Sequence, residues 1–226
     1  MRFIIEDTNE HAGQWTARYI VNRILEHQAK TDKPFVLGLP TGSTPLSTYK
    51  ELINLYKEGK VSFKNVITFN MDEYVDLPEE HPESYHSFMW NNFFNHVDIN
   101  PENVFVPKLT EAKEAAEVSE FCADYDAKAR NLDLLVMGMG EKGQIGFNEA
   151  GASDKSRTRT VLLPYSSRKR ESKNFANIAE TPDKAIAMGI STMLSAKKIY
   201  LSGNLFSSSL LNGLKKITQA CGPDVE

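Results

Sequence analysis

Short runs of apolar residues that alternate with helical patterns constrain the fold of this 226-residue chain more than any other feature. The apolar runs lie at 34–40, 66–70, 132–138, 160–164, 185–190 and 198–203. Segments with apolar residues at helical spacing flank these runs, at 10–28, 45–56, 82–94, 118–130 and 205–216. Strands that are apolar throughout and alternate with helices are typical of a parallel sheet covered on both faces. We therefore predict an α/β fold in a single domain over 1–226, with a mostly parallel, doubly wound, Rossmann-like sheet and helices on both faces.

The composition excludes several classes of function. Of the residues, 41% are hydrophobic and 25% charged, as in a soluble globular protein, and the net charge of −4 leaves no basic footprint for nucleic acid. No apolar run approaches the length of a membrane span, so we expect a cytoplasmic protein with no membrane partner. The two cysteines, Cys122 and Cys221, lack the spacing of a disulfide framework or a zinc site. We expect no metal and no cofactor.

The first polar loop that follows a predicted strand is suited to a phosphate. It contains Gly42, Ser43 and Thr44, and a helical pattern begins directly after it. Glycine lets backbone N–H groups approach a ligand closely, the hydroxyls add donors, and the start of a helix attracts anions. The loop lacks the ending of a Walker motif. A simple turn with a hydroxyl cap is the alternative.

Two further loops should meet the first, because the carboxyl ends of parallel strands share one edge of a sheet. Asp72 and Glu73 follow the run at 66–70, and a carboxyl that is partly buried there would have a pKa suited to proton transfer. The alternative is a cap by Asp72 with Glu73 in solvent. The glycine-rich stretch at 137–149, MGMGEKGQIGFNE, brings Asn148 and Glu149 to the same edge. The charged run SSRKRESK at 166–173 predicts a loop or lid, either solvated or in contact with an anion.

Several motifs together resemble the glucosamine-6-phosphate deaminase family, whose members convert glucosamine 6-phosphate and water to fructose 6-phosphate and ammonia. They are PFVLGLPTGSTP, VITFNMDEYVDLPEEHPESYHSFMWNNFFNHVDI, GFNE and SRTR, with a nearly continuous match from 34 to 104. The resemblance implies a sugar-phosphate ligand. It also implies that Asp72 moves a proton between C2 and C1 of the opened sugar with Glu73 beside it, that Gly42, Ser43 and Thr44 hold the phosphate, and that Glu149 assists ring opening.

The resemblance also implies substituted positions. The family usually reads GxDGHIAFNE, and Lys142 and Gln144 stand here at its aspartate and histidine. Glutamine does not shuttle a proton near neutral pH, so we expect reduced deaminase activity. Lys173 stands at a phosphate-binding arginine and Phe206 at a lysine. Two alternatives remain: a catalytically silent sugar-phosphate binder or sensor, and a structural partner of an active homologue. The related 6-phosphogluconolactonase activity is not favoured, because it also relies on the missing histidine.

Regulation and assembly are further expectations from the family. Arg159, in SRTR, matches an arginine of the bacterial allosteric site for N-acetylglucosamine 6-phosphate, whereas Ala152, Val161 and Leu162 replace its usual polar partners. Arg159 is therefore a candidate remnant of that site. The bacterial hexamers lead us to expect a homo-oligomer. The family continues with one more strand and helix, which we expect this chain to lack.

Overall fold

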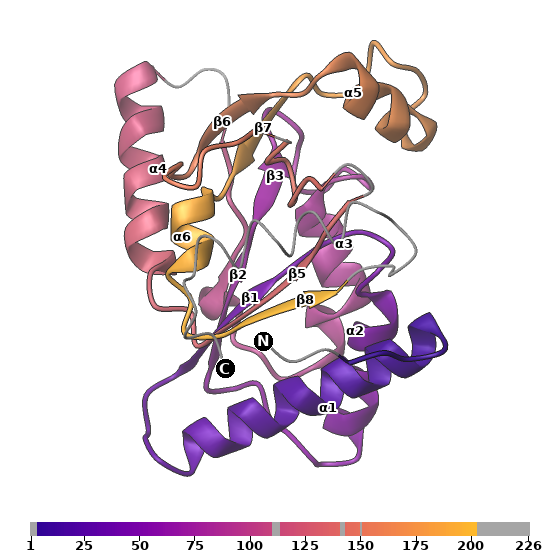
Figure 1. Cartoon of the computed structure of the whole chain (residues 1–226), viewed down its shortest axis with the longest axis vertical. Helices are drawn as coiled ribbons and strands as arrows, with labels where there is room; N and C mark the ends of the chain where they lie inside the picture. Colours follow the sequence, from indigo (N-terminus) through magenta and orange to yellow (C-terminus); the bar gives the residue numbers. More distant parts are fainter. Residues whose placement is uncertain (1–3, 110–113, 141–142, 150, 203–226) are drawn as a thin grey trace.

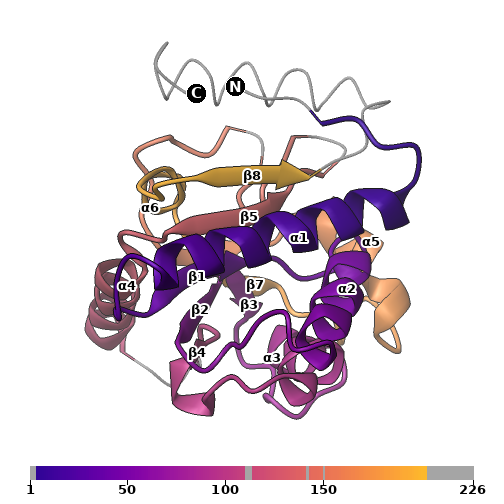
Figure 2. The ribbon, with the colours of Figure 1, turned by 90° about the horizontal axis from the view of Figure 1, so that it is seen from below.

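The computed structural model describes residues 4–109, 114–140, 143–149 and 151–202, and its centre is a parallel sheet of five strands (Figure 1). The strand order is β4-β2-β1-β5-β8, which Figure 2 shows stacked from β4 to β8. The bounds are β1 Phe35–Leu39, β2 Val66–Asn70, β4 Val104–Phe105, β5 Leu134–Gly138 and β8 Ile199–Ser202. Every pair in this sheet is parallel. The predicted α/β class is confirmed.

Helices cover both faces of this sheet, because alternate strand residues are apolar on both sides. The helices are α1 Asn9–Gln28, α2 Leu46–Lys57, α3 Tyr85–Asn92, α4 Ala115–Ala129, α5 Tyr165–Glu171 and α6 Ile190–Leu194. On β5, Leu134 and Val136 belong to the core that contains buried residues of α1, α2 and α3. Leu135 and Met137 point the other way, into the core that contains residues of α4 and α6. None of the described helices is long and apolar enough to cross a lipid bilayer.

A second, antiparallel sheet of three strands corrects one part of the prediction. Its order is β3-β7-β6, with bounds β3 Asp72–Tyr74, β6 Arg159–Leu162 and β7 Lys184–Ala187. The runs at 160–164 and 185–190 do form strands, but they pair here and not in the parallel sheet. The burial of β6 alternates, and Leu162 is 74% exposed. Such alternation is typical of an antiparallel sheet with one solvated face.

Three other expectations need correction or lie outside the described residues. Part of the run at 166–173, which we expected to be a loop or lid, is the helix α5, followed by the 3-10 turn Ser172–Asn174. The helix expected over 82–94 begins only at Tyr85, because the Ser84 hydroxyl accepts the N–H of Ser87 and caps it. Short 3-10 turns also lie at Phe94–His96 and Pro101–Asn103. The helix expected over 205–216 falls outside the described residues.

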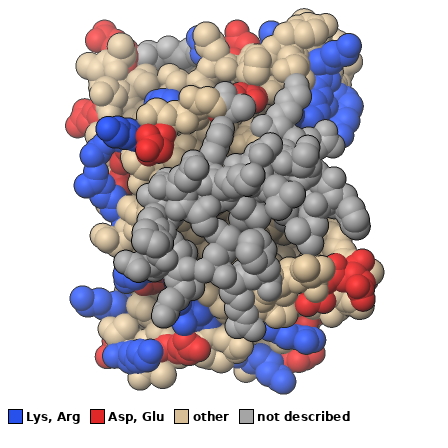
Figure 3. Space-filling view, in the orientation of Figure 1, with Lys and Arg blue, Asp and Glu red and all other residues tan. Residues whose placement is uncertain are grey.

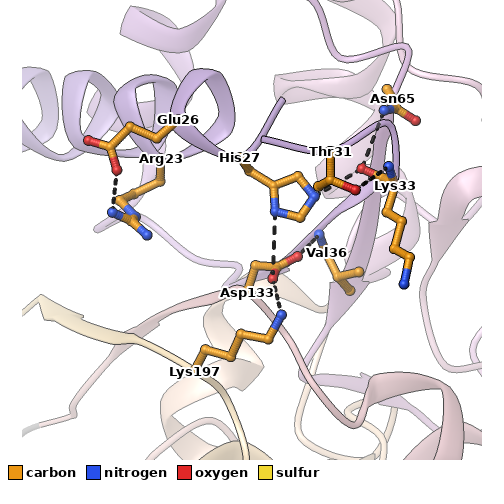
Figure 4. Close-up of polar contacts among 9 residues, drawn as sticks. All are labelled: Arg23, Glu26, His27, Thr31, Lys33, Val36, Asn65, Asp133 and Lys197. Carbon is orange, nitrogen blue, oxygen red and sulfur yellow. Dashed lines mark hydrogen bonds and ion pairs between the residues drawn. The ribbon is translucent and has the colours of Figure 1, made fainter. Parts of the chain in front are cut away.

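A buried carboxylate ties the strands together at their amino ends. Asp133 directly precedes β5 and accepts the N–H of Val36 at 2.9 Å, on β1, and the Nζ of Lys197 at 2.6 Å (Figure 4). Nδ1 of His27, near the end of α1, lies 3.9 Å from the same carboxylate. This cluster lies at the strand edge opposite the candidate site, so the site loops are free of this structural role.

Candidate active site

Asp72 lies at the carboxyl edge of the parallel sheet, two residues after the end of β2, and is the first residue of β3. Its side chain is nearly inaccessible, with an exposed fraction of 4%, and Oδ2 accepts the backbone N–H of Phe147 at 3.0 Å. Burial raises the pKa of Asp72 to about 7, with a smaller rise from the charge of Glu73, while the Phe147 hydrogen bond lowers it. A carboxyl with a pKa near neutral can both accept and return a proton.

Gly146 allows the glycine-rich loop to close over this carboxyl. Its φ of +56° lies in the left-handed region, and a Cβ at this position would overlap Oδ2 of Asp72. The next residue is Phe147, whose N–H makes the bond to Asp72. The loop therefore needs glycine at 146 for both backbone conformation and space.

Glu73 points to the opposite face of β3 from Asp72, because neighbouring strand residues alternate. Its carboxylate accepts the N–H groups of Tyr74 at 2.8 Å, Tyr85 at 3.0 Å and His86 at 2.8 Å. The last two belong to the first turn of α3, where N–H groups lack partners within the helix. Burial raises the pKa of Glu73, and these three bonds oppose the rise. The alternative that placed Glu73 in solvent is wrong: it is a buried anchor for α3.

Glu149 connects the glycine-rich loop to α5. Its Oε1 accepts the hydroxyl of Ser167 at 2.5 Å, and Ser167 is buried within α5. The Glu149 side chain is only partly buried. A second anchor holds the same helix, since Nη2 of Arg168 donates to the carbonyl groups of Ile178 and Thr181. The sequence did not suggest Ser167, because one serine in a charged run carries no distinctive signal.

The candidate phosphate loop is exposed and open. Gly42, Ser43 and Thr44 are all exposed, and Gly42 has a φ of +96°. Neither the Ser43 nor the Thr44 hydroxyl makes a hydrogen bond within the described part of the chain. The loop leads directly into α2, whose first N–H groups attract an anion. The assignment of a phosphate to this loop stays a prediction.

Basic residues gather on α5 and the turn that follows it. They include Arg168, Lys169, Arg170 and Lys173, and Figure 3 shows blue atoms at the upper right, where α5 lies in Figure 1. Arg170 pairs with Glu171, with Nε 2.8 Å from Oε1. Lys173 is exposed. Its ammonium group is therefore available to solvent or to a ligand.

An aromatic cluster holds Phe147 beside Asp72. The ring of Phe147 stacks on Tyr85, with centroids 5.6 Å apart and planes at 4°, and lies 5.2 Å from the ring of Tyr74. Phe175 contacts Tyr74 edge-on at 5.9 Å. Sequence reasoning missed this cluster, because its members come from four separate segments.

The guanidinium of Arg159 makes hydrogen bonds within the chain. Its Nη1 donates to Oδ1 of Asn148 at 3.0 Å and to the carbonyl of Arg157 at 3.3 Å. The structure therefore brings Arg159 to the loop beside Asp72. Its role as a remnant of an allosteric site stays a prediction.

The sequence matches, over residues 7–202, the family described as glucosamine-6-phosphate isomerases/6-phosphogluconolactonase. The chain belongs to this family. The glucosamine-6-phosphate deaminase of Parabacteroides distasonis is 47% identical over 208 residues, which are 90% of this chain and 76% of that protein. The deaminase of Drosophila melanogaster is 45% identical over 202 residues, 89% of this chain and 74% of that one.

Solved structures support the same placement. The structure of a monomeric glucosamine-6-phosphate deaminase is 37% identical, covers 97% of this chain and 88% of that chain, and has a TM-score of 0.83. The 6-phosphogluconolactonase of Thermotoga maritima has a TM-score of 0.66 at 15% identity, over 96% of this chain and 88% of that one, which shows a shared fold alone. Family membership is thus confirmed, while the roles of individual residues stay predictions.

Of the two substituted positions in the glycine-rich loop, Gln144 lies within the described residues and Lys142 does not. Gln144 is buried, and its side chain packs so closely on Gly140 that a Cβ at 140 would overlap it. The backbone N–H of Gly140 donates to the backbone carbonyl of Gln144 at 2.9 Å. Phe206 also lies outside the described residues. The carboxamide of Gln144 is therefore part of the packed loop rather than an exposed side chain.

Proposed function

We propose that this chain is a glucosamine-6-phosphate deaminase, which converts glucosamine 6-phosphate and water to fructose 6-phosphate and ammonia. The observation that carries the proposal is the buried carboxyl of Asp72, held by the Phe147 N–H with its pKa raised to about 7. Such a group is suited to carry a proton between neighbouring carbons. Relatives named as this deaminase, at 45% and 47% identity, supply the reaction and the substrate.

Asp72 acts on the open-chain sugar. It takes the proton from C2 and returns it to C1, while the C1 oxygen gains a proton and the amino group loses one. The product has a hydroxyl at C1 and an imine at C2. Water adds to this imine, and ammonia departs to give the ketone of fructose 6-phosphate. Glu73 does not take part directly in this account, because its carboxylate is filled by three backbone N–H groups. It holds α3 and thereby the neighbouring aromatic cluster.

The sugar phosphate binds where Gly42, Ser43 and Thr44 open onto the start of α2. The support is the exposure of this loop, the unused hydroxyls and the helix N-terminus. Lys173 supplies a positive charge from the turn after α5. A lysine binds phosphate as a point charge, without the two parallel bonds of an arginine.

Ring opening is the step at which we expect reduced activity. Glu149, held by Ser167, is the ionisable group that the family assigns to this step and that remains here. Gln144 stands at the position of the family histidine and cannot replace its proton transfer. Losing one general acid-base group costs roughly 10² to 10⁴ in rate. The buried carboxamide of Gln144 also favours the second candidate, a sugar-phosphate binder without turnover.

A coupled assay for fructose 6-phosphate separates the two candidates. It compares the natural chain with the double variant Lys142→Asp and Gln144→His. Slow turnover by the natural chain and a gain in the double variant support a deaminase with impaired ring opening. Absence of turnover, with calorimetric binding of glucosamine 6-phosphate, supports the silent binder. The homo-oligomer stays a prediction, and the solved deaminase with the TM-score of 0.83 is monomeric.

A further inference from the structure

We propose that Arg159 is a positioning residue for the carboxyl of Asp72, and that it acts through Asn148. The proposal deepens the proposed function, since it concerns the same site. It rests on a continuous set of contacts from β6 to the glycine-rich loop. The hydrogen bonds of Arg159 within the described residues go to Asn148 and the Arg157 carbonyl, and none goes directly to Asp72.

The small antiparallel sheet places Arg159 and Asp72 in the same row. Both residues pair with Ala187 of β7, Asp72 from β3 on one side and Arg159 from β6 on the other. Residues directly opposite in an antiparallel sheet point to the same face. The two side chains therefore emerge on one face of the sheet, separated by the small side chain of Ala187.

Asn148 receives the guanidinium and transmits its position to the backbone. Its Oδ1 accepts from Nη1 of Arg159 at 3.0 Å, and its Nδ2 donates to the carbonyl groups of Met188 at 2.9 Å and Ile145 at 3.3 Å. Asn148 is buried, so each of these partners replaces water. The side chain is fixed on both ends.

Both carbonyl contacts lead to Asp72. The N–H of Met188 donates to the carbonyl of Met71 at 2.7 Å, directly before Asp72. Ile145 and Asn148 exchange two backbone hydrogen bonds, of 3.1 and 3.0 Å, which close a tight turn around Gly146 and Phe147. The orientation of this turn directs the Phe147 N–H at Asp72. Without Arg159, the Oδ1 of a buried asparagine loses its donor, and the turn loses one constraint.

Steady-state kinetics of Arg159→Gln test the proposal, with Arg157→Gln as the matched control. Arg157 contributes only its backbone carbonyl to this network and is exposed. We expect Arg159→Gln to lower kcat by about 10- to 100-fold with KM within about twofold, because misplacing a catalytic group by about 1 Å costs as much. Arg159→Lys should recover part of the loss, and Arg157→Gln should match the natural chain.

The pH profile separates positioning from general loss of structure. A hydrogen bond to the carboxylate favours its ionised form, so a weaker Phe147 bond should move the acid limb of kcat to higher pH in Arg159→Gln. The titratable groups that interact electrostatically with Asp72 are Glu73, Tyr74, Tyr85 and Tyr125, and all remain in both variants. The guanidinium of Arg159 lies on the same face of the sheet, so a shift that Arg159→Lys also shows does not come from the lost charge. Unchanged kcat and acid limb in a folded Arg159→Gln would overturn the proposal. A higher KM with unchanged kcat would also do so, because it would assign Arg159 to substrate binding.

A measurement without turnover keeps this inference separate from the proposed function. Carbon-13 NMR of aspartate carboxyl groups, with Asp72→Asn to assign the signal, follows the pKa of Asp72 directly. We expect this pKa to be higher in Arg159→Gln than in the natural chain and in Arg157→Gln. An equal pKa in all three would overturn the positioning role even if the chain proves to be a binder only.

Discussion

The backbone N–H of Phe147 donates a 3.0 Å hydrogen bond to the carboxylate of Asp72, although 75 positions separate the two residues. Burial destabilises the charged form of this carboxyl and raises its pKa, whereas the hydrogen bond stabilises the charged form and lowers the pKa. The opposing effects leave a proton acceptor whose pKa is near 7. The reactivity of the site therefore depends on how the glycine-rich loop is held against β3.

Gly146→Ala should impair catalysis more than a glycine substitution nearby. Both Gly146 and Gly143 have positive φ, but only at 146 would the new Cβ meet Asp72. We expect both variants to lose about 1–3 kcal/mol of unfolding free energy, which is typical of a strained backbone position. Only Gly146→Ala should also lower kcat, by about tenfold or more, as the loop moves away from Asp72. Equal kcat values in the two variants would contradict this account.

The pH dependence of kcat/KM should show an acid limb near pH 7. Burial raises the pKa of Asp72 to about 7, and the base must be ionised to act. Below this pH, kcat/KM should fall tenfold per pH unit. An acid limb near pH 4 would mean that another carboxyl, less buried, is the base.

The raised pKa of Asp72 also makes the stability of the fold depend on pH. The folded chain binds the Asp72 proton more tightly than the unfolded chain, whose ordinary pKa is 3.8. The contribution of Asp72 to stability is therefore present at low pH and is lost progressively as pH rises from about 4 to about 7. Urea denaturation across this range should show a smaller loss for Asp72→Asn than for the natural chain. If the unfolding free energy changes equally with pH in the two proteins, the pKa of Asp72 is the same in the folded and the unfolded chain.

Glu73→Gln should weaken folding rather than chemistry alone. A glutamine has one acceptor oxygen in place of two, so part of the first turn of α3 loses its partner. We expect a loss of about 1–3 kcal/mol in unfolding free energy. Glu79→Gln is the control, since Glu79 pairs with Lys108 at the surface and should cost less than about 1 kcal/mol. A stable Glu73→Gln that lacks turnover would instead assign Glu73 to the reaction.

Replacing both hydroxyls of the phosphate loop should affect binding before catalysis. We expect Ser43→Ala with Thr44→Ala to raise KM for glucosamine 6-phosphate by about tenfold, because each hydrogen bond to a charged group contributes about 1.5–3 kcal/mol and water replaces part of it. Inhibition by inorganic phosphate should weaken in parallel. The control is Ser62→Ala, because the Ser62 hydroxyl donates to Asp98 at the surface. An unchanged KM would contradict the assignment of the substrate phosphate to Ser43 and Thr44.

Local pattern predicted β1, β2, β5 and β8 of the parallel sheet, because each forms from a mainly apolar run. It did not predict β4, which has only two residues. It could not predict β3, which is three residues long and begins with two acids. Strands were expected at 160–164 and 185–190 and lie at Arg159–Leu162 and Lys184–Ala187. Their antiparallel pairing was not expected, because pairing depends on contacts distant in sequence.

The same distinction applies to the site. Adjacency suggested that Asp72 and Glu73 act together, whereas strand alternation sends them to different partners. The donor to Asp72 is the backbone N–H of Phe147, and a backbone donor cannot be predicted from the residue type at that position. The motif GFNE identified Asn148 as a candidate, but its contact with Arg159 depends on the pairing of β6 with β7, which the sequence did not predict.

The most direct test of the central claim is the coupled assay for fructose 6-phosphate from glucosamine 6-phosphate, run on the natural chain and on Asp72→Asn. The account predicts measurable turnover by the natural chain and a loss of at least about 10²-fold in kcat in the variant, with folding retained. Turnover that is equal in the two proteins would contradict the assignment of Asp72 as the base.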